Sequence, residues 1–326
     1  MLSTVLSSGL FCNFIDTQPE KVPYDDEKKN FSWMSLWNFI KFQSNVTLID
    51  EQKIDDKHLI FLNGLTTGRG DAKIRMISNL DIGNYDQLHH NKWGRVNFCS
   101  LDMVHEFSLM NQNVLIADER NYYEKWDNLN LNSLAKSLDV RESAQNNKFT
   151  EWAELKQYLL PSNEVLLVDR YVLGDNSLLY SNLFKIIDVF EDVNNSEYLF
   201  VIVTEGNSSP IINKQAYNSI SDYISNKNYK CRLGVVFTQS WNRSKAREHD
   251  RNIITSYLRI NSGDSFNYFD SRGNILTQTS ISFFSHADKD NFINSGNILK
   301  DIRTLIGNNQ KNTLGNSILS LFDDFI

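Results

Sequence analysis

The chain has 326 residues, of which 41% are hydrophobic and 22% are charged, so it has enough apolar side chains for one large or two ordinary globular domains. Its formal net charge is −7, which excludes a global electrostatic attraction for nucleic acid or anionic lipid and leaves only a local basic surface for such binding. The three cysteines show no CxxC spacing, which excludes a disulfide framework or a cysteine zinc site and is typical of a reducing compartment.

No stretch of the sequence approaches the ~18–20 consecutive apolar residues that a membrane helix needs. The opening segment, Met1–Ile15, has neither the basic start nor the small-residue cleavage site of an export signal. We therefore expect it to form the first strand or helix of a cytoplasmic protein without a membrane anchor.

The first half of the chain predicts a mixture of helices and strands. Phe31–Phe42 places large apolar residues at helical spacing. Short apolar runs bounded by Asn, Asp and Gly predict strands at Val46–Ile49, His58–Leu62, Val96–Leu101 and Asn113–Ala117. Two further segments predict helices, Leu131–Leu138 and Trp152–Leu160, and Pro161 ends the second.

Strands and helices alternate more regularly in the second half. Three runs predict strands, Val165–Val168, Tyr198–Thr204 and Arg232–Thr238, and two predict helices between them, Ser177–Val193 and Asn213–Ile224. The strands are apolar on both faces, which is typical of parallel strands covered by helices, so we expect them to be adjacent and central in one sheet.

The pattern changes after Arg251. Short strands are predicted at Ile253–Ile260, Ser265–Asp270 and Thr277–Phe284, with a hairpin turn at Ser271–Asn274, and helices at Asp288–Ile306 and Leu314–Phe325. The predicted fold is α/β, with a mixed sheet and helices on both faces. Residues 1–160 form an N-terminal α/β region, and residues 161–326 a C-terminal domain.

Two short motifs do not complete the sites that they resemble. Gly64–Asp71 is rich in glycine but lacks the Gly-Lys-Ser/Thr of a phosphate-binding loop, so it predicts a surface turn at which Arg69, Lys73 and Arg75 offer an anion-binding edge. Glu154-Leu155-Lys156 matches half of a metal-dependent nuclease site, but its helical setting favours a solvated helix face. No histidine or cysteine spacing fits a metal centre, so the sequence predicts neither metal nor cofactor.

The segment His249-Asp250-Arg251 is followed by a predicted β-run and then by Ser262-Gly-Asp-Ser-Phe266. This order resembles the degenerate, His-Asp-Arg branch of the phospholipase D-like superfamily and is similar to the C-terminal domain of MIT-domain proteins. The resemblance covers Glu164–Ser285, roughly a third of the chain. It implies that the C-terminal domain has a phospholipase D-like fold.

Catalytic members of that superfamily carry His-x-Lys and then an aspartate five positions after the lysine. His249 and Arg251 match the first two positions, with arginine for lysine, and Ser256 takes the position of the aspartate. A second His-x-Lys, at His90–Lys92, has Asn97 at that position. The resemblance therefore implies a domain without full catalytic equipment, although an arginine still binds phosphate through its planar fork.

Two interpretations of these residues remain open. In the first, Asp169, Asp250 and Arg251 form a buried structural network that fixes the start of a strand. In the second, His249 and Arg251 recognise a phosphate.

A basic cluster with one aromatic residue precedes the motif. Its members are Lys230, Trp241, Arg243, Lys245 and Arg247. Basic side chains beside an aromatic ring suit a nucleic-acid backbone and a stacked base, and a solvated loop is the alternative.

The resemblance implies a non-enzymatic recognition or adaptor subunit of a prokaryotic antiviral defence system. Its partner is expected to be a protein encoded nearby, or DNA or RNA. The alternative function is a phosphodiesterase or nuclease that uses His249 and Arg251 and is completed by a partner subunit. A third possible function is that of a scaffold without a ligand.

Overall fold

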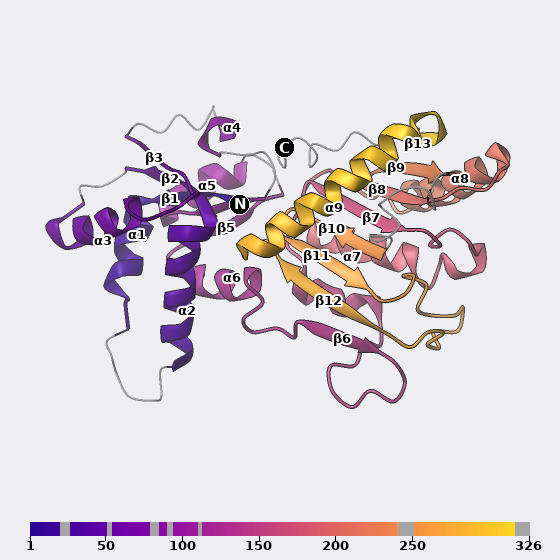
Figure 1. The fold of residues 1–326 in the computed structure, drawn as a ribbon, viewed down its shortest axis with the longest axis horizontal. Coiled ribbons are helices and arrows are strands. Elements are labelled where there is room, and N and C mark those ends of the chain that lie inside the picture. The colour runs from indigo at the N-terminus through magenta and orange to yellow at the C-terminus, as the bar shows by residue number, and fades with distance from the viewer. Residues whose placement is uncertain are drawn as a thin grey trace. The chain divides into compact units, whose positions relative to one another are not determined.

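The computed structural model describes residues 1–19, 27–50, 54–78, 85–89, 94–109, 113–239, 241 and 251–316. The chain divides into two compact units, shown in Figure 1. Unit 1 consists of Met1–Ser133 and Ser285–Ile293, and unit 2 of Leu134–Phe284 and Asn294–Ile326. The division therefore falls at Ser133 rather than at residue 160, and a short C-terminal segment returns to unit 1.

Unit 1 contains a parallel five-stranded sheet in the order β3-β2-β1-β4-β5. Its strands are β1 (Leu2–Ser7), β2 (Ser44–Ile49), β3 (Ile74–Ile77), β4 (Arg95–Phe98) and β5 (Leu115–Ala117). The direction in which strands are added reverses at β1, which is the arrangement of a doubly wound α/β fold. Short strands with helical crossovers give this order, since parallel neighbours need long connections.

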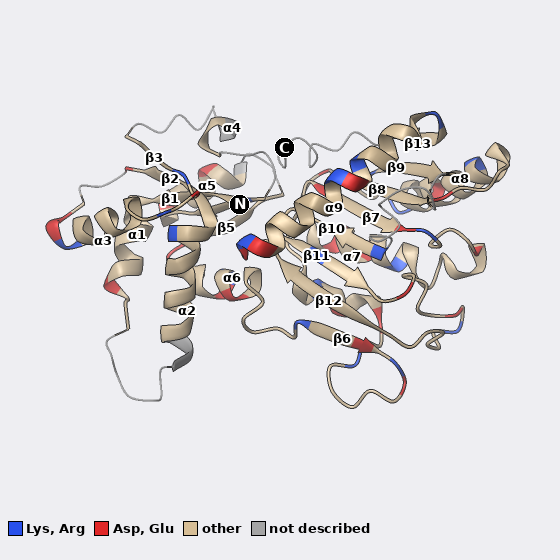
Figure 2. Ribbon diagram, viewed as in Figure 1, with Lys and Arg blue, Asp and Glu red and all other residues tan. Residues whose placement is uncertain are grey.

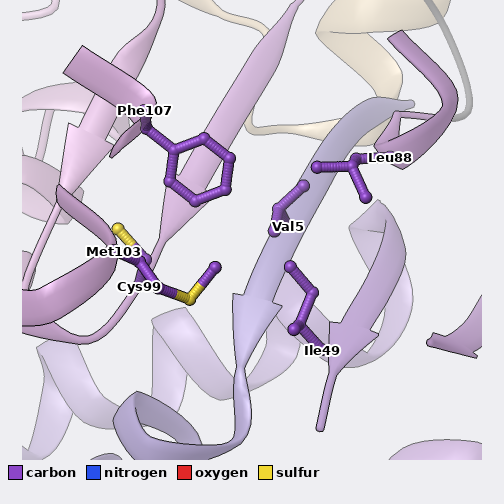
Figure 3. Close-up of a cluster of buried hydrophobic side chains, with 6 residues drawn as sticks. All are labelled: Val5, Ile49, Leu88, Cys99, Met103 and Phe107. Atoms are coloured by element: carbon purple, nitrogen blue, oxygen red, sulfur yellow. The ribbon is translucent and has the colours of Figure 1, made fainter. Parts of the chain in front are cut away.

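The helices of unit 1 follow the strands in sequence. They are α1 (Ser8–Asp16), α2 (Glu27–Asn38), α3 (Asp56–Thr66), α4 (Tyr85–Leu88), α5 (Leu101–Leu109) and α6 (Tyr122–Leu129), with a π-helical turn at Phe39–Gln43. Figure 3 shows the apolar cluster on one face of the sheet, made of Val5, Ile49, Leu88, Cys99, Met103 and Phe107. Residues from β1, from β2, from the residue after β4 and from α4 and α5 thus share one core.

The predicted strand at His58–Leu62 is wrong, because this segment lies within α3. The Asp55 carboxylate accepts a hydrogen bond of 2.9 Å from the backbone N–H of His58 and so caps the helix. The predicted helix at Leu131–Leu138 is also wrong, since its last two residues begin a strand, β6 (Ser137–Val140).

Unit 2 contains a mixed eight-stranded sheet in the order β13-β9-β8-β7-β10-β11-β12-β6. After β6, its strands are β7 (Glu164–Asp169), β8 (Tyr198–Glu205), β9 (Cys231–Thr238), β10 (Arg251–Ile254), β11 (Leu258–Ser262), β12 (Thr279–Ser285) and β13 (Thr313–Gly315). Strands β7, β8 and β9 are parallel, and β10 is antiparallel to β7. The prediction of three adjacent, internal apolar strands is confirmed for the described part of the sheet, as is the mixed α/β fold class.

The helices of unit 2 are α7 (Leu183–Val193), α8 (Pro210–Asn226) and most of α9 (Lys289–Asn308), with 3-10 helices at Trp152–Tyr158, Asn176–Leu178 and Gln310–Asn312. The start of α9, as far as Ile293, belongs to unit 1. β6 belongs to unit 2 because it pairs antiparallel with β12. This pairing is the reason that residues 134–160 leave the N-terminal region.

Three predictions after Arg251 change in detail. The single strand at Ile253–Ile260 is two antiparallel strands, β10 and β11, joined by a short turn. The segment Ser265–Asp270 forms no strand, although Phe269 pairs with Ile275 across the predicted turn, where Gly273 has a φ of +85°. Of the helix predicted at Leu314–Phe325, the described residues belong to β13 and its end, and the remainder lies outside the described range.

Candidate functional site at the strand ends of unit 2

Three parallel strands of unit 2 end at one edge of the sheet. β7 ends at Asp169, β8 at Glu205 and β9 at Thr238. β10 runs the other way and begins at this edge, with Arg251 in register with Asp169. Ligands of α/β sheets bind outside the carboxyl ends of the strands, so this edge is the candidate site.

Asp169 is a fully buried carboxylate at this edge. Its Oδ1 accepts a hydrogen bond of 2.8 Å from the backbone N–H of Tyr171. Its Oδ2 accepts bonds of 2.8 Å from Ser265 Oγ and 2.6 Å from the N–H of Phe266. Burial raises the pKa of Asp169 to about 6, although these hydrogen bonds and the charge of Arg251 act in the opposite direction. The carboxylate therefore fastens the segment after β11 to the end of β7.

Arg251 lies opposite Asp169 and continues the same network. Its Nη1 donates a hydrogen bond of 2.9 Å to the carbonyl of Gly263, and its own carbonyl accepts one of 3.1 Å from Asn261 Nδ2. Gly263 fits closely here, because an added Cβ would lie 2.6 Å from Thr279 Oγ1. The contacts of Asp169 and Arg251 therefore favour the structural interpretation for these two residues. His249 and Asp250 lie outside the described residues.

Beside this network, Arg170 and Glu205 form a two-pronged ion pair. Arg170 Nε lies 2.8 Å from Glu205 Oε2, and Nη2 lies 3.0 Å from Oε1. The pair lines a pocket of about 310 Å³ together with residues of α8, among them Ile212 and Asn213. Gly206 forms part of its wall, where an added Cβ would lie 2.8 Å from Phe237 Cβ. A bulkier residue at Gly206 would therefore displace the end of β9.

Large side chains with apolar surface are exposed here: Tyr171 and Ile212 line the pocket, and Ile211 precedes Ile212 in α8. The exposed fractions are 44% for Tyr171, 70% for Ile211 and 47% for Ile212. The Arg170 guanidinium lies over the Tyr171 ring, 5.1 Å from its centroid. We call these three residues, with Arg170 and Glu205, the strand-end surface. Aromatic, aliphatic and arginine side chains in this combination are typical of protein–protein contacts.

Of the predicted basic cluster, the structure describes only Lys230 and Trp241. Lys230 precedes β9, at the opposite end of that strand, so about 25 Å of strand at ~3.3 Å per residue separates it from this edge. Its Nζ donates a hydrogen bond of 2.6 Å to the carbonyl of Asn194. Figure 2 shows basic residues spread over both units. Arg243, Lys245 and Arg247 lie outside the described residues.

The predicted role of Trp241 needs correction. Its side chain is only 1% exposed, and a base cannot stack on an indole that is covered by protein. The structure therefore argues for Trp241 as a core residue. An aromatic residue in a basic segment can be either exposed or buried, so the sequence around Trp241 did not reveal its burial.

Two other residues that the sequence singled out, Ser256 and Glu154, have structural surroundings of their own. Ser256, which the resemblance places at the position of the catalytic aspartate, is buried between β10 and β11, at the end of β10 away from Arg251. The carboxylate of Glu154 accepts a hydrogen bond of 2.9 Å from the N–H of Thr150, beside the 3-10 helix. His90–Lys92 lies outside the described residues.

The glycine-rich turn at Gly64–Asp71 is held by Arg69. This buried guanidinium donates hydrogen bonds to five backbone carbonyls, those of Ile40, Ser44, Leu65, Ala72 and Lys73. Its donors are therefore directed at the protein backbone rather than outward, which removes it from the predicted anion-binding edge.

Sequence reasoning missed Arg170, Glu205 and the isoleucines of α8. A signal was present, because Arg170 and Glu205 directly follow the apolar runs of β7 and β8. Charged residues at that point in two parallel strands meet at one edge of a sheet.

Within the described residues, no group of three or more His, Cys, Asp or Glu side chains is placed to hold a metal ion. No described helix is long and apolar enough to cross a membrane. Comparison of the chain with known protein families and with curated proteins finds no match.

Proposed function

We propose that this chain is a non-enzymatic recognition or adaptor subunit that binds a protein partner through the strand-end surface. The observation that carries the proposal is the exposure of Tyr171 and Ile212, which line the pocket of the Arg170–Glu205 pair, and of Ile211, which precedes Ile212 in α8. Exposed apolar groups that gather around a polar pocket mark a contact surface more often than isolated ones do.

The surface rests on a rigid support. Asp169 and Arg251 bind backbone groups of two segments, the one after β7 and the one after β11, so the ends of β7 and β10 are fixed before any partner arrives. A preorganised surface loses less conformational entropy when it binds. The resemblance to the degenerate phospholipase D-like branch supports a cytoplasmic role in prokaryotic antiviral defence, with a partner encoded by a neighbouring gene.

Nucleic acid is the second candidate ligand. The observation that favours it is the position of Arg243, Lys245 and Arg247 in the sequence, between the end of β9 and the start of β10. Both of these strand ends lie at the edge of the sheet that carries the strand-end surface. Basic residues in a segment that connects these two strand ends suit a phosphate backbone.

The test uses the purified chain and the protein encoded by its neighbouring gene, with affinity measured by interferometry. We expect Ile211→Asp to weaken binding about tenfold or more, because a buried charge at a contact centre is poorly tolerated. The matched control is Ile60→Asp in α3, since Ile60 is 71% exposed and Ile211 is 70% exposed. Equal binding by wild type and Ile211→Asp, or an equal loss in both variants, would refute the strand-end surface as the contact.

A further inference from the structure

A second pocket of unit 2 lies along one face of α7. It is formed by residues 150–156, by the segment 177–181, by α7 itself and by the turn at 269–273, all of which belong to unit 2. Its volume of about 650 Å³ falls in the range of pockets that hold small organic molecules. We call it the α7 pocket.

Three buried side chains form the base of the α7 pocket. The exposed fractions are 3% for Trp152, 3% for Val189 and 4% for Phe269. The rings of Trp152 and Phe269 meet edge to face, with their centroids 6.1 Å apart. The base is therefore apolar and largely aromatic.

Asn182 holds the two rings of the base in place. Its Oδ1 accepts hydrogen bonds of 3.3 Å from Trp152 Nε1 and of 3.0 Å from the backbone N–H of Phe269. Its Nδ2 donates one of 2.8 Å to the carbonyl of Phe269. Because one buried side chain ties together two walls of the pocket, the base is formed before a ligand enters, which reduces the entropy lost on binding.

The rim of the α7 pocket is charged. Lys156 Nζ lies 2.6 Å from Asp192 Oδ2, and Lys185 Nζ lies 3.5 Å from Asp188 Oδ2, so each lysine on the rim has an aspartate beside it. Glu151 also lines the pocket, and its exposed carboxylate forms no ion pair with any residue that the structure describes. With two lysines and three carboxylates, the rim carries a net charge of −1.

Tyr180 adds an aromatic ring to this rim. Its exposed fraction is 71%, and its ring lies edge to face against that of Phe184, with 4.9 Å between the centroids. An aromatic face attracts an ammonium group, as a carboxylate does. The exposed ring and the carboxylate of Glu151 therefore favour the same kind of ligand group, a cation.

We propose that the α7 pocket binds a small arylalkylamine, a molecule with a flat apolar body and one positive charge. The body packs against the aromatic base, and the ammonium group lies at the rim with Glu151 and Tyr180. A carboxylate with the same body binds less well, because the two lysines are already paired and a third carboxylate repels it. The site goes beyond the proposed function, since it shares no lining residue with the pocket of the Arg170–Glu205 pair.

Calorimetric titration of the full chain at constant ionic strength tests the proposal with three probes that share an indole ring. They are tryptamine, which is positively charged, tryptophol, which is neutral, and indole-3-acetate, which is negatively charged. We expect one-to-one binding of tryptamine, tighter than that of tryptophol by about threefold or more, because an exposed ion pair contributes modestly. Indole-3-acetate should bind most weakly. Equal affinities for tryptamine and indole-3-acetate, or no binding of any probe, would overturn the proposal.

Two substitutions locate the site. Ala153 is exposed and lines the pocket, so Ala153→Phe should fill the pocket and weaken tryptamine binding about tenfold or more, through a steric clash. Glu151→Gln keeps the shape of the side chain but removes its charge, so tryptamine and tryptophol should then bind about equally well. The matched control is Glu142→Gln, because Glu142 is an exposed glutamate of the same unit that does not line the pocket.

The variants also show how the proposal fails. Tryptamine binding that is unchanged in Ala153→Phe would place the amine elsewhere on the protein. A preference for tryptamine over tryptophol that persists in Glu151→Gln, or that Glu142→Gln removes equally, would contradict the assigned charge contact. If Ala153→Phe does not fold, as judged by circular dichroism, the ratio of the two affinities in Glu151→Gln still provides the measurement.

Discussion

Asp169 holds together parts of the chain that lie far apart in sequence. Its carboxylate binds the N–H of Tyr171 beside it and two groups nearly a hundred positions later, Ser265 Oγ and the N–H of Phe266. The same residue sits opposite Arg251, the last residue of the His-Asp-Arg motif. A single buried acid therefore connects the motif to the central strand of unit 2.

The raised pKa of Asp169 predicts a pH dependence of stability. The carboxyl keeps this proton up to about pH 6 in the folded protein, and only up to the ordinary aspartate pKa of 3.8 in the unfolded chain. The stability that the group contributes is therefore greatest below about pH 4 and falls by on the order of 3 kcal/mol as the pH rises to 6. Urea unfolding of wild type and Asp169→Asn between pH 4 and pH 7 measures this difference. A difference that does not vary with pH would contradict the assignment.

The His-Asp-Arg motif predicts that the isolated chain does not hydrolyse DNA, RNA or model phosphodiesters. Catalytic members of the phospholipase D-like superfamily, which the motif resembles, carry an aspartate where this chain has Ser256, and Ser256 is buried between β10 and β11. Without an orienting carboxylate, an attacking histidine loses orders of magnitude in rate. The measurement is hydrolysis by wild type and His249→Ala. Hydrolysis by wild type that is lost in His249→Ala would instead establish the alternative function, a phosphodiesterase or nuclease that uses His249.

At the scale of elements, the central strands of unit 2 were predictable because they are apolar on both faces. Leu167 in β7 is fully buried between β8 and β10. We expect Leu167→Ala to lower the free energy of unfolding by about 2–5 kcal/mol, through lost burial and a cavity. Leu276→Ala is the control, since Leu276 is 53% exposed and should cost less than about 0.5 kcal/mol. Urea denaturation compares the two, and similar losses in both would show that β7 is not central to the core.

The elements that sequence reasoning misread have short apolar runs that fit more than one structure. His58–Leu62 is long enough for a strand, and only the capping carboxylate of Asp55 reveals the start of α3. Ser265 and Phe266 read as part of a strand because they precede alternating aromatic residues, but both bind Asp169 instead. Such bonds join distant segments, so no local pattern predicts them.

The candidate site was less predictable than the fold, because it too depends on contacts between segments that are distant in the sequence. A run of charges such as Arg243, Lys245 and Arg247 is visible in the sequence, whereas the exposure of Ile211 or the burial of Trp241 depends on the packed structure. Register is equally invisible, and it alone brings Arg75 and Arg95 to one face of the unit 1 sheet. The sequence shows which charged and aromatic residues the chain contains, but it does not show which of them lie together in the fold.

At the scale of the whole molecule, the net charge of −7 opposes binding to nucleic acid. If the basic segment does bind it, affinity should fall steeply with salt. The log–log slope should then shrink by about one unit for each of Arg243→Ala, Lys245→Ala and Arg247→Ala. Filter binding to single- and double-stranded DNA and RNA at two salt concentrations measures the slope. Lys230→Ala, at the other end of β9, is the control, and an equal change there would argue against a localised contact.

The return of Ser285–Ile293 to unit 1 has a consequence for how the protein is made. Ser285 Oγ donates a hydrogen bond to the carbonyl of Leu129, and Lys289 Nζ lies 3.2 Å from Asp71 Oδ2, both within unit 1. A ribosome produces these two residues only after residues 134–284 have been synthesised. Unit 1 therefore begins first but stays incomplete until seven of the eight strands of the larger sheet have been translated, and only β13 of that sheet follows it.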